Sequence, residues 1–187
     1  MARFEFGLGL NAEGPVHETL EKAVYAEELG FDSVWISDSP YQRHPFAVAS
    51  AIAAKTHRIK IAFGLISPFL HTPRSIAGAL HCLLQTYGDR FELCIGPGDR
   101  NRLMKVGITL PPAAQIQEHL LKARYEISEK LEEEGYDVKI WLGAQGSKML
   151  QIASPFSGVL LNHASLQMIK WAVDSIRAKD TGVRRIG

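Results

Sequence analysis

Short apolar runs alternate along the chain with longer segments whose apolar residues recur every three or four positions. The short runs have the length of strands, and the longer segments have the period of amphipathic helices. Proline near the start and glycine at the end mark some of the helical segments. The pattern predicts strands at 3–10, 32–38, 58–66, 91–96, 137–146 and 158–164, and helices at 15–30, 44–56, 72–88, 113–135, 147–156 and 165–180.

The predicted order is a strand followed by a helix, repeated about six times, and residues 184–187 could begin a seventh strand. Apolar strands that alternate with helices indicate an α/β fold with a parallel sheet covered by helices. Such a sheet is either doubly wound and open or closed as a (βα) barrel, and the pattern favours neither. Ligands meet the carboxyl ends of the strands in both architectures, so a site is expected at those ends.

Composition and charge exclude several classes of protein. The 187 residues are 46% hydrophobic and 22% charged, which fits one globular domain over 1–187. The formal net charge of +1 predicts no general attraction to nucleic acid or to a membrane surface. There is no signal-peptide pattern, and no apolar stretch has the length of a membrane span. Cys82 and Cys94 lie in apolar runs and are expected to be buried free thiols, which suits the cytoplasm.

The second and third strands end in candidate site residues. Asp38 follows the run DSVWIS, where its carboxylate could orient a substrate, accept a proton or cap a turn before Pro40. Gly64 interrupts the strand pattern IKIAFGLI, which indicates a bulge or a close approach of another group to the backbone. Ser67 and Pro68 would then form a polar exit from this strand.

The fourth strand runs into the sequence Gly96, Pro97, Gly98 and Asp99. The two glycines allow backbone conformations that other residues avoid. Asp99 could act as an acid, as a base or as the N-cap of a short helix over NRLMKVG. Capping alone explains Asp99, but it does not explain the paired glycines.

The fifth strand leads into a helix through the small-residue run Gly143, Ala144, Gln145 and Gly146. Such a run exposes backbone N–H groups that suit a phosphate or carboxylate, although a tight turn explains it equally well. Asn162 and His163 end the sixth strand, where the imidazole could be an acid, a base, a ligand or a structural group. The histidines and cysteines show no metal-ligand spacing, so no metal site is expected.

The strand-end sequences together resemble the bacterial luciferase-like flavin and deazaflavin enzymes. The relevant motifs are AEELGFDSVWISD, IAFGLISPFLHTPRSIAGAL, CIGPGDRNRLMKVGI, IWLGAQGSKMLQIAS and GVLLNHAS. Their order and spacing are most similar to the methylenetetrahydromethanopterin reductase branch. The resemblance implies a (βα)8 TIM-type barrel. It also implies hydride transfer between reduced coenzyme F420 and a pterin-linked one-carbon substrate, as in one-carbon metabolism and methanogenesis.

The resemblance also implies roles for individual residues. Gly64 and Leu65 would form a bulge behind the deazaflavin ring, and Gly143–Gly146 would lie along the cofactor's polar tail. Asp99 would be an acid or proton relay, and Asp38 a polar group near the ring. The other residues expected to contact the cofactor are Ser67, Gly96, Pro97, Gly98 and Asn162.

The chain departs from the family pattern in three ways. Asp38 is followed by Ser39, where the family usually has histidine, and Gly9 stands where the reductase branch tends to have a carboxylate. The chain also lacks most of a seventh and an eighth strand, which predicts an incomplete barrel and a homo-oligomer that covers the gap. The alternatives are an FMN-dependent monooxygenase or reductase, and an inactive paralogue that binds a cofactor or a protein.

Overall fold

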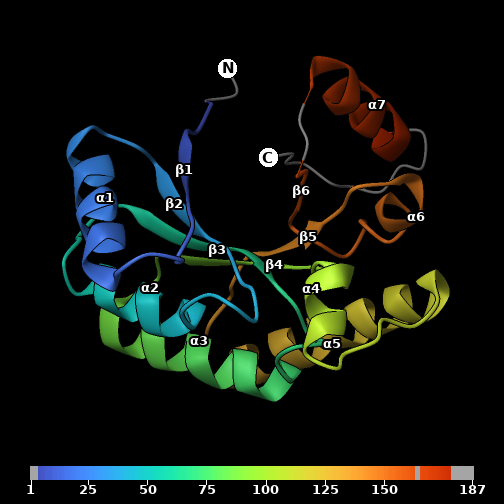
Figure 1. The fold of residues 1–187 in the computed structure, drawn as a ribbon, viewed down its shortest axis with the longest axis horizontal. Helices are drawn as coiled ribbons and strands as arrows, with labels where there is room; N and C mark the ends of the chain where they lie inside the picture. Colours follow the sequence, from blue (N-terminus) through green and yellow to red (C-terminus); the bar gives the residue numbers. More distant parts are fainter. Residues whose placement is uncertain (1–3, 163–164, 178–187) are drawn as a thin grey trace.

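Six parallel strands lie side by side in the order in which they occur along the chain (Figure 1). They are β1 (Gly7–Leu10), β2 (Ser33–Ile36), β3 (Lys60–Ile66), β4 (Phe91–Ile95), β5 (Ile140–Gly143) and β6 (Gly158–Leu160). The computed structural model describes residues 4–162 and 165–177. A doubly wound sheet would reverse its strand order at a switch point, whereas this order is sequential and the sheet curls. The fold is therefore a half-barrel of the TIM type, as the resemblance implied.

Helices follow the strands along the chain, and most of them cover the outer face of the curled sheet (Figure 1). They are α1 (Val16–Glu28), α2 (Pro45–Ala53), α3 (Pro73–Tyr87), α4 (Arg100–Lys105), α5 (Ala113–Glu133), α6 (Ser147–Leu150) and α7 (Leu166–Arg177). The main core lies between these helices and outward-facing strand residues such as Phe63 and Leu93, which are fully buried. In the described part of the chain, no helix is both long and apolar enough to cross a membrane.

Local sequence signals explain where several helices begin and end. Thr72 caps α3 by accepting a hydrogen bond from the Ser75 N–H at 3.2 Å, and Pro73 occupies the first helical position. Gly88 ends the helix with φ +81°, a conformation that suits glycine. The Ser165 hydroxyl likewise accepts a hydrogen bond from the Met168 N–H at the start of α7.

Most predicted elements are shorter in the structure; the strand expected over 137–146, for example, is reduced to β5 (Ile140–Gly143). The strand expected over 3–10 begins at Gly7, because the Phe6 N–H donates to the Asp32 carboxylate at 2.8 Å instead of to a neighbouring strand. The helix expected over 147–156 is α6, which ends at Leu150 and is followed by turns. The possible seventh strand at 184–187 lies outside the described residues.

The prediction for the two cysteines is half right. Cys94 on β4 is fully buried, and this burial raises the pKa of its thiol. Cys82 is exposed, so the expected burial was wrong for this residue. The buried face of α3 is formed by residues 76, 77, 80, 83 and 84, which leaves position 82 on the outer side of the helix.

The inner face of the sheet combines small residues on the central strands with tryptophans beside them. Strand register aligns Trp35 on β2 with Ala62 on β3, and Cys94 on β4 with Trp141 on β5. The two indole rings meet edge to face, with centroids 5.7 Å apart and an interplanar angle of 86°. The tryptophans thus occupy space over the small residues of the central strands.

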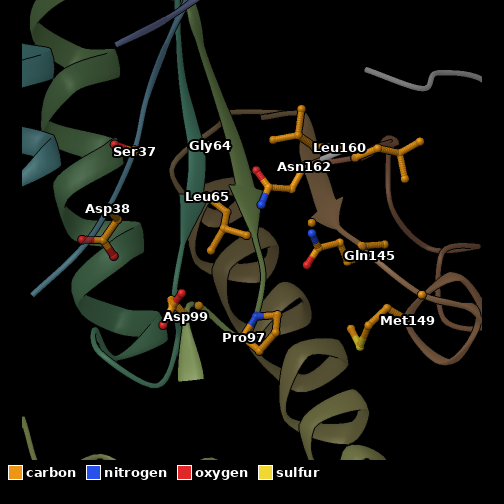
Figure 2. A pocket seen from close by; sticks show the side chains of 15 residues that line it. Ser37, Asp38, Gly64, Leu65, Pro97, Asp99, Gln145, Met149, Leu160 and Asn162 are labelled. Atoms are coloured by element: carbon orange, nitrogen blue, oxygen red, sulfur yellow. The ribbon is translucent and has the colours of Figure 1, made fainter. Parts of the chain in front are cut away.

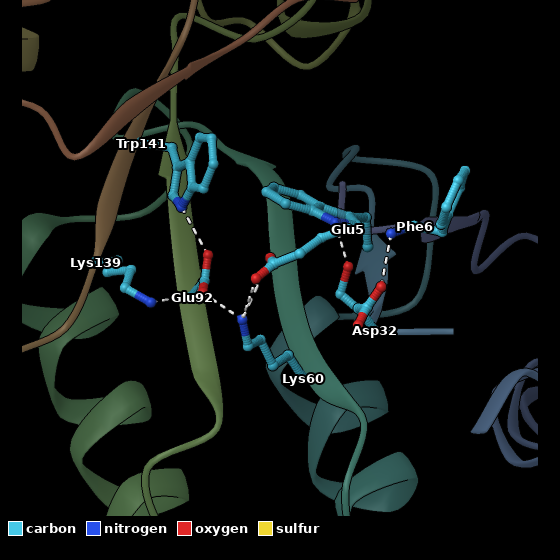
Figure 3. A network of polar contacts seen from close by, with 9 residues as sticks. Glu5, Phe6, Asp32, Lys60, Glu92, Lys139 and Trp141 are labelled. Atoms are coloured by element: carbon cyan, nitrogen blue, oxygen red, sulfur yellow. Dashed lines mark hydrogen bonds and ion pairs between the residues drawn. The ribbon is translucent and has the colours of Figure 1, made fainter. Parts of the chain in front are cut away.

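A polar network lies towards the amino ends of the strands, away from their carboxyl ends (Figure 3). Glu92 is 7% exposed, and it accepts hydrogen bonds from Trp141 Nε1 at 2.8 Å and Lys139 Nζ at 3.3 Å. Lys60 Nζ lies 3.7 Å from the same carboxylate and 3.3 Å from that of Glu5. A buried carboxylate needs such partners, and these join β3, β4 and β5.

Glu27 connects α1 to the segment that leads into β3. Its carboxylate accepts hydrogen bonds from the backbone N–H groups of His57, Arg58 and Ile59, the last at 2.8 Å. Partial burial opposes ionisation, but these three bonds and the Arg58 charge outweigh it and hold the pKa of Glu27 below its usual value. The ionised form of Glu27 therefore stabilises the folded state.

We predict that Glu27→Gln lowers the free energy of unfolding by about 1 kcal/mol at pH 7, because charge-assisted hydrogen bonds are replaced by neutral ones. The pKa of Glu27 is lower in the folded than in the unfolded protein. The stabilisation by Glu27 is therefore complete above the unfolded glutamate pKa of about 4.3, and it is lost as the pH falls through the pKa of the folded state. Urea unfolding at pH 7 and at pH 3 measures this difference. Glu28→Gln is the matched control, and a pH-independent difference for Glu27→Gln would contradict the assignment.

Candidate functional site

A cavity of about 440 Å³ opens at the carboxyl ends of strands β2 to β6 (Figure 2). Its size is within the range of sites for cofactors and small ligands. All parallel strands end at the same edge of the sheet, so residues far apart in sequence meet here. The cavity is lined by Ser37, Asp38, Gly64, Leu65, Pro97, Gly98, Asp99, Gly143, Ala144, Gln145, Gly146, Met149, Leu160, Leu161 and Asn162.

The structure brings most of the predicted site residues to this cavity, although their roles remain predictions. Ser67 and Gly96 are not among the lining residues and lie behind the wall. Ser67 is 3% exposed, and its hydroxyl donates to the Pro97 carbonyl at 3.0 Å. His163 is outside the described residues.

Sequence reasoning missed four of the lining residues: Ser37, Met149, Leu160 and Leu161. Ser37 directly precedes Asp38, and the two leucines directly precede Asn162, so a search that included the two residues before each of these candidates would have found them. Met149 lies in α6, and the direction of its side chain depends on how this short helix packs. No sequence signal pointed to Met149.

The glycines around the fourth and fifth strand ends have identifiable structural reasons, and for Gly96 and Gly143 the reason is the side chain of Leu65. A Cβ atom at Gly96 would lie 2.6 Å from Leu65 Cδ2, and one at Gly143 would lie 2.5 Å from the same atom. Real side chains do not approach so closely, so both glycines make room for Leu65. Gly98 has φ +80°, a conformation in which a larger side chain would be strained.

Gly64 lies where the register of β3 against β4 shifts, between Phe63 and Ile66, as the predicted bulge requires. A Cβ atom at Gly64 would lie 2.7 Å from Trp35 Cε3 and 3.2 Å from Leu160 Cδ2. The backbone at Gly64 and the side chain of Leu65 therefore form a compact apolar part of the cavity wall.

Asp38 is the more deeply buried of the two carboxylates in the cavity wall. Its side chain is 3% exposed, and its Oδ2 lies 3.1 Å from His71 Nε2 and 3.4 Å from the Ser67 backbone nitrogen. No lysine or arginine of the described residues forms an ion pair with Asp38. The sequence pattern identified Asp38 but gave no sign that His71 contacts it.

Asp99 caps α4, as one of its sequence interpretations predicted. Its Oδ1 accepts a hydrogen bond from the Arg102 N–H at 2.9 Å. Arg102 Nη1 in turn donates to Ser39 Oγ at 3.1 Å and lies 3.9 Å from a Glu13 carboxylate oxygen. The cap therefore places α4 against loops that follow β1 and β2 at the rim of the cavity.

The cavity is lined by backbone atoms, apolar side chains and the carboxylates of Asp38 and Asp99. Among residues 4–162 and 165–177, no group of three or more histidine, cysteine, aspartate or glutamate side chains is placed to hold a metal ion. An apolar lining with a few polar groups is typical of small-molecule sites.

The family profile of the luciferase-like monooxygenases matches residues 1–118. This match covers more than half of the chain, and the chain belongs to that family.

Among the similar proteins is 5,10-methylenetetrahydromethanopterin reductase from Methanolobus tindarius, which is 30% identical over 97% of this chain. The alignment spans 60% of that relative, so the chain is markedly shorter than the curated protein it matches. The coenzyme F420-dependent tetrahydromethanopterin reductase from Methanopyrus kandleri superposes with a TM-score of 0.89 at 24% identity, over 97% of this chain and 63% of its own. This agreement confirms a partial TIM barrel.

A second structural relative is the oxygenating constituent of 3,6-diketocamphane monooxygenase from Pseudomonas putida, in complex with FMN. Its TM-score is 0.77 at 18% identity, over 97% of this chain and 64% of its own. At this identity the likeness concerns the fold alone.

We predict that Asp99→Ala lowers the free energy of unfolding by about 1 kcal/mol, because the α4 N-cap bond is lost. Asp99→Asn should stay within about 0.3 kcal/mol of the wild type, since asparagine caps helices as well as aspartate does. Urea unfolding measures the first effect, and amide hydrogen exchange in α4 shows whether the loss is local. Equal stability and equal exchange in the two variants would contradict the capping role.

Proposed function

We propose that the chain binds coenzyme F420 at the carboxyl ends of its strands and takes part in hydride transfer between the reduced cofactor and a pterin-linked one-carbon substrate. The observation that carries this proposal is that the Gly64–Leu65 bulge, residues Pro97–Asp99 and the Gly143–Gly146 turn line one shared cavity. The 30% identity to the Methanolobus tindarius reductase over nearly the whole chain supports the choice of reaction.

The cavity residues fit a flat ring with a polar tail. Hydride transfer depends on holding two rings face to face without intervening water, which is a task of positioning. Leu65, Met149 and Leu160 supply apolar contact, and Gly64 lines the cavity with backbone alone, against which Trp35 and Leu160 pack. In the Gly143–Gly146 run the Ala144 N–H already donates to the Leu160 carbonyl at 3.0 Å, so we assign the tail to the N–H groups of Gln145 and Gly146. When bound, F420 would supply the hydride.

Asp38 and Asp99 are the residues we propose for proton handling. Both line the cavity, and Asp38 is held in a fixed place by hydrogen bonds on one oxygen. Formation of a reactive one-carbon substrate requires a proton at a leaving nitrogen, which a carboxyl group in the cavity can deliver. Asp99→Asn keeps the helix cap, so it separates a catalytic role of the carboxylate from its structural role.

FMN is the second candidate cofactor, because a structural relative with this fold carries it. Its isoalloxazine ring is also flat and would use the same bulge. A third possibility is a paralogue without turnover, which is motivated by Gly9 on β1. The affinities of the protein for F420 and for FMN distinguish the F420-dependent, FMN-dependent and inactive alternatives.

We predict that F420 binds with a dissociation constant in the micromolar range and that FMN binds at least tenfold more weakly; fluorescence titration measures both. Gly64→Ala should weaken F420 binding by more than tenfold, because its Cβ displaces either Trp35 behind the wall or Leu160, which lines the cavity. Gly9→Ala is the matched control, since a Cβ there meets no atom within 4 Å. Tighter binding of FMN would favour the second candidate, and no affinity for either cofactor would refute both enzyme proposals.

We also propose that copies of the chain associate over the open side of the half-barrel. In the described part of the chain β1 and β6 are sheet edges, and Phe4 and Phe6 beside β1 are 86% and 69% exposed. Unpaired edges and exposed aromatic residues favour association. Light scattering coupled to size exclusion should therefore give a mass of at least two chains, and a stable monomer at micromolar concentration would contradict this.

A further inference from the structure

His71 reaches the cavity wall from the connection between β3 and α3, and it contacts the carboxylate of Asp38. The distance between His71 Nε2 and Asp38 Oδ2 is 3.1 Å. The side chains are 15% and 3% exposed, so both groups are largely removed from water. Hydrogen bonds between partly buried groups of this kind fix side-chain orientation more firmly than exposed ones do.

We propose that His71 is a positioning residue for Asp38: its imidazole holds Oδ2 of the carboxylate so that Oδ1 is presented to the ligand in the cavity. The catalytic part of this proposal rests on the proposed function. The positional part concerns the protein alone and can be measured without any cofactor.

The hydrogen-bonding capacities of the two groups support this arrangement. An ionised carboxylate only accepts hydrogen bonds, so in the proposed arrangement the His71 ring nitrogen, 3.1 Å from Oδ2, is the protonated one and donates. The Ser67 backbone N–H approaches the same oxygen, with its nitrogen 3.4 Å away. Both donors use Oδ2, and among the described residues no donor is bonded to Oδ1. Asp38 lines the cavity, so Oδ1 is the oxygen left for a ligand.

The imidazole is itself held by an aromatic chain that leads into the core. The rings of His71 and His44 meet edge to face, with centroids 5.2 Å apart. His44 lies 5.8 Å from the Phe46 ring, and Phe46 lies 4.5 Å from the buried Phe63 ring on β3. These ring contacts restrict the position of the His71 imidazole, which in turn restricts the carboxylate of Asp38.

The alternative for His71 is a purely structural role in the loop that leads into α3. That loop has another histidine contact for comparison. His119 on α5 packs on Phe69 with ring centroids 4.4 Å apart, and its Nε2 lies 3.2 Å from the Pro68 carbonyl oxygen. His119 therefore supports the same loop without touching Asp38, and His119→Gln is the matched control.

The first experiment tests the positional part on cofactor-free protein by NMR. With ¹⁵N-labelled histidine, we expect an exchange-protected Nε2 proton of His71 that resonates downfield of the amides. This signal should disappear in Asp38→Ala and persist in His119→Gln. A wild-type spectrum in which His71 has no protected Nε2 proton, or one that survives in Asp38→Ala, would overturn the proposal.

The second experiment measures hydride transfer in two variants of His71. His71→Phe keeps a ring against His44 but has no donor, and kcat should fall roughly 10- to 100-fold with KM within about threefold, as expected for a misplaced reacting group. His71→Gln keeps an N–H donor and should recover kcat to within about threefold of the wild type. His119→Gln should leave kcat unchanged.

The outcomes of this experiment are distinguishable. If His71→Gln is as impaired as His71→Phe, donation to Asp38 is not the role of His71 and the proposal is wrong. If His71→Phe does not fold by circular dichroism, His71→Ala replaces it as the variant without a donor. If wild-type protein binds neither F420 nor FMN, the proposed function fails, and the NMR experiment still decides whether His71 positions Asp38.

Discussion

The crowded inner face of the sheet is the constraint on which the rest of the structure depends. The Leu65 side chain lies where Cβ atoms at Gly96 and Gly143 would meet it, and Trp35 comes close to the backbone at Gly64 because Gly64 also has no side chain. Interiors of proteins are packed as densely as crystals of small molecules, so a single extra carbon at these positions must displace a neighbour. The shape of the cavity therefore depends on which strand positions are glycine.

The two ends of the half-barrel use polar residues in different ways. Towards the amino ends of the strands, Glu92 is surrounded by Lys60, Lys139 and Trp141, and its hydrogen-bonding capacity is directed to the protein itself. At the carboxyl ends, Asp38 has donors on one oxygen only. A buried carboxylate with all its partners stabilises the fold, whereas one with an oxygen facing a cavity is available to a ligand. This difference agrees with the usual location of function in TIM-type barrels.

The elements and most of the cavity wall were predictable because they depend on local patterns. The period of the apolar residues identified the strands and helices, and the rule that parallel strands present their carboxyl ends together selected Asp38, Gly64 and Asp99. The exposure of Cys82 was missed because an apolar run does not reveal which side of a helix faces the core. The choice between an open sheet and a barrel also depends on strand order, which is a property of the folded chain.

The sequence by itself determined the alternating strands and helices, the caps such as Thr72 and Asp99, and the set of strand-end residues from which a site is built. These features follow from the conformational preferences of neighbouring residues. Only the tertiary structure decided that Leu65 requires Gly96 and Gly143, that Glu92 belongs to a buried network, and that His71 bonds to Asp38. Each of these contacts joins residues about 30 or more positions apart, and such contacts depend on the packing of the whole sheet.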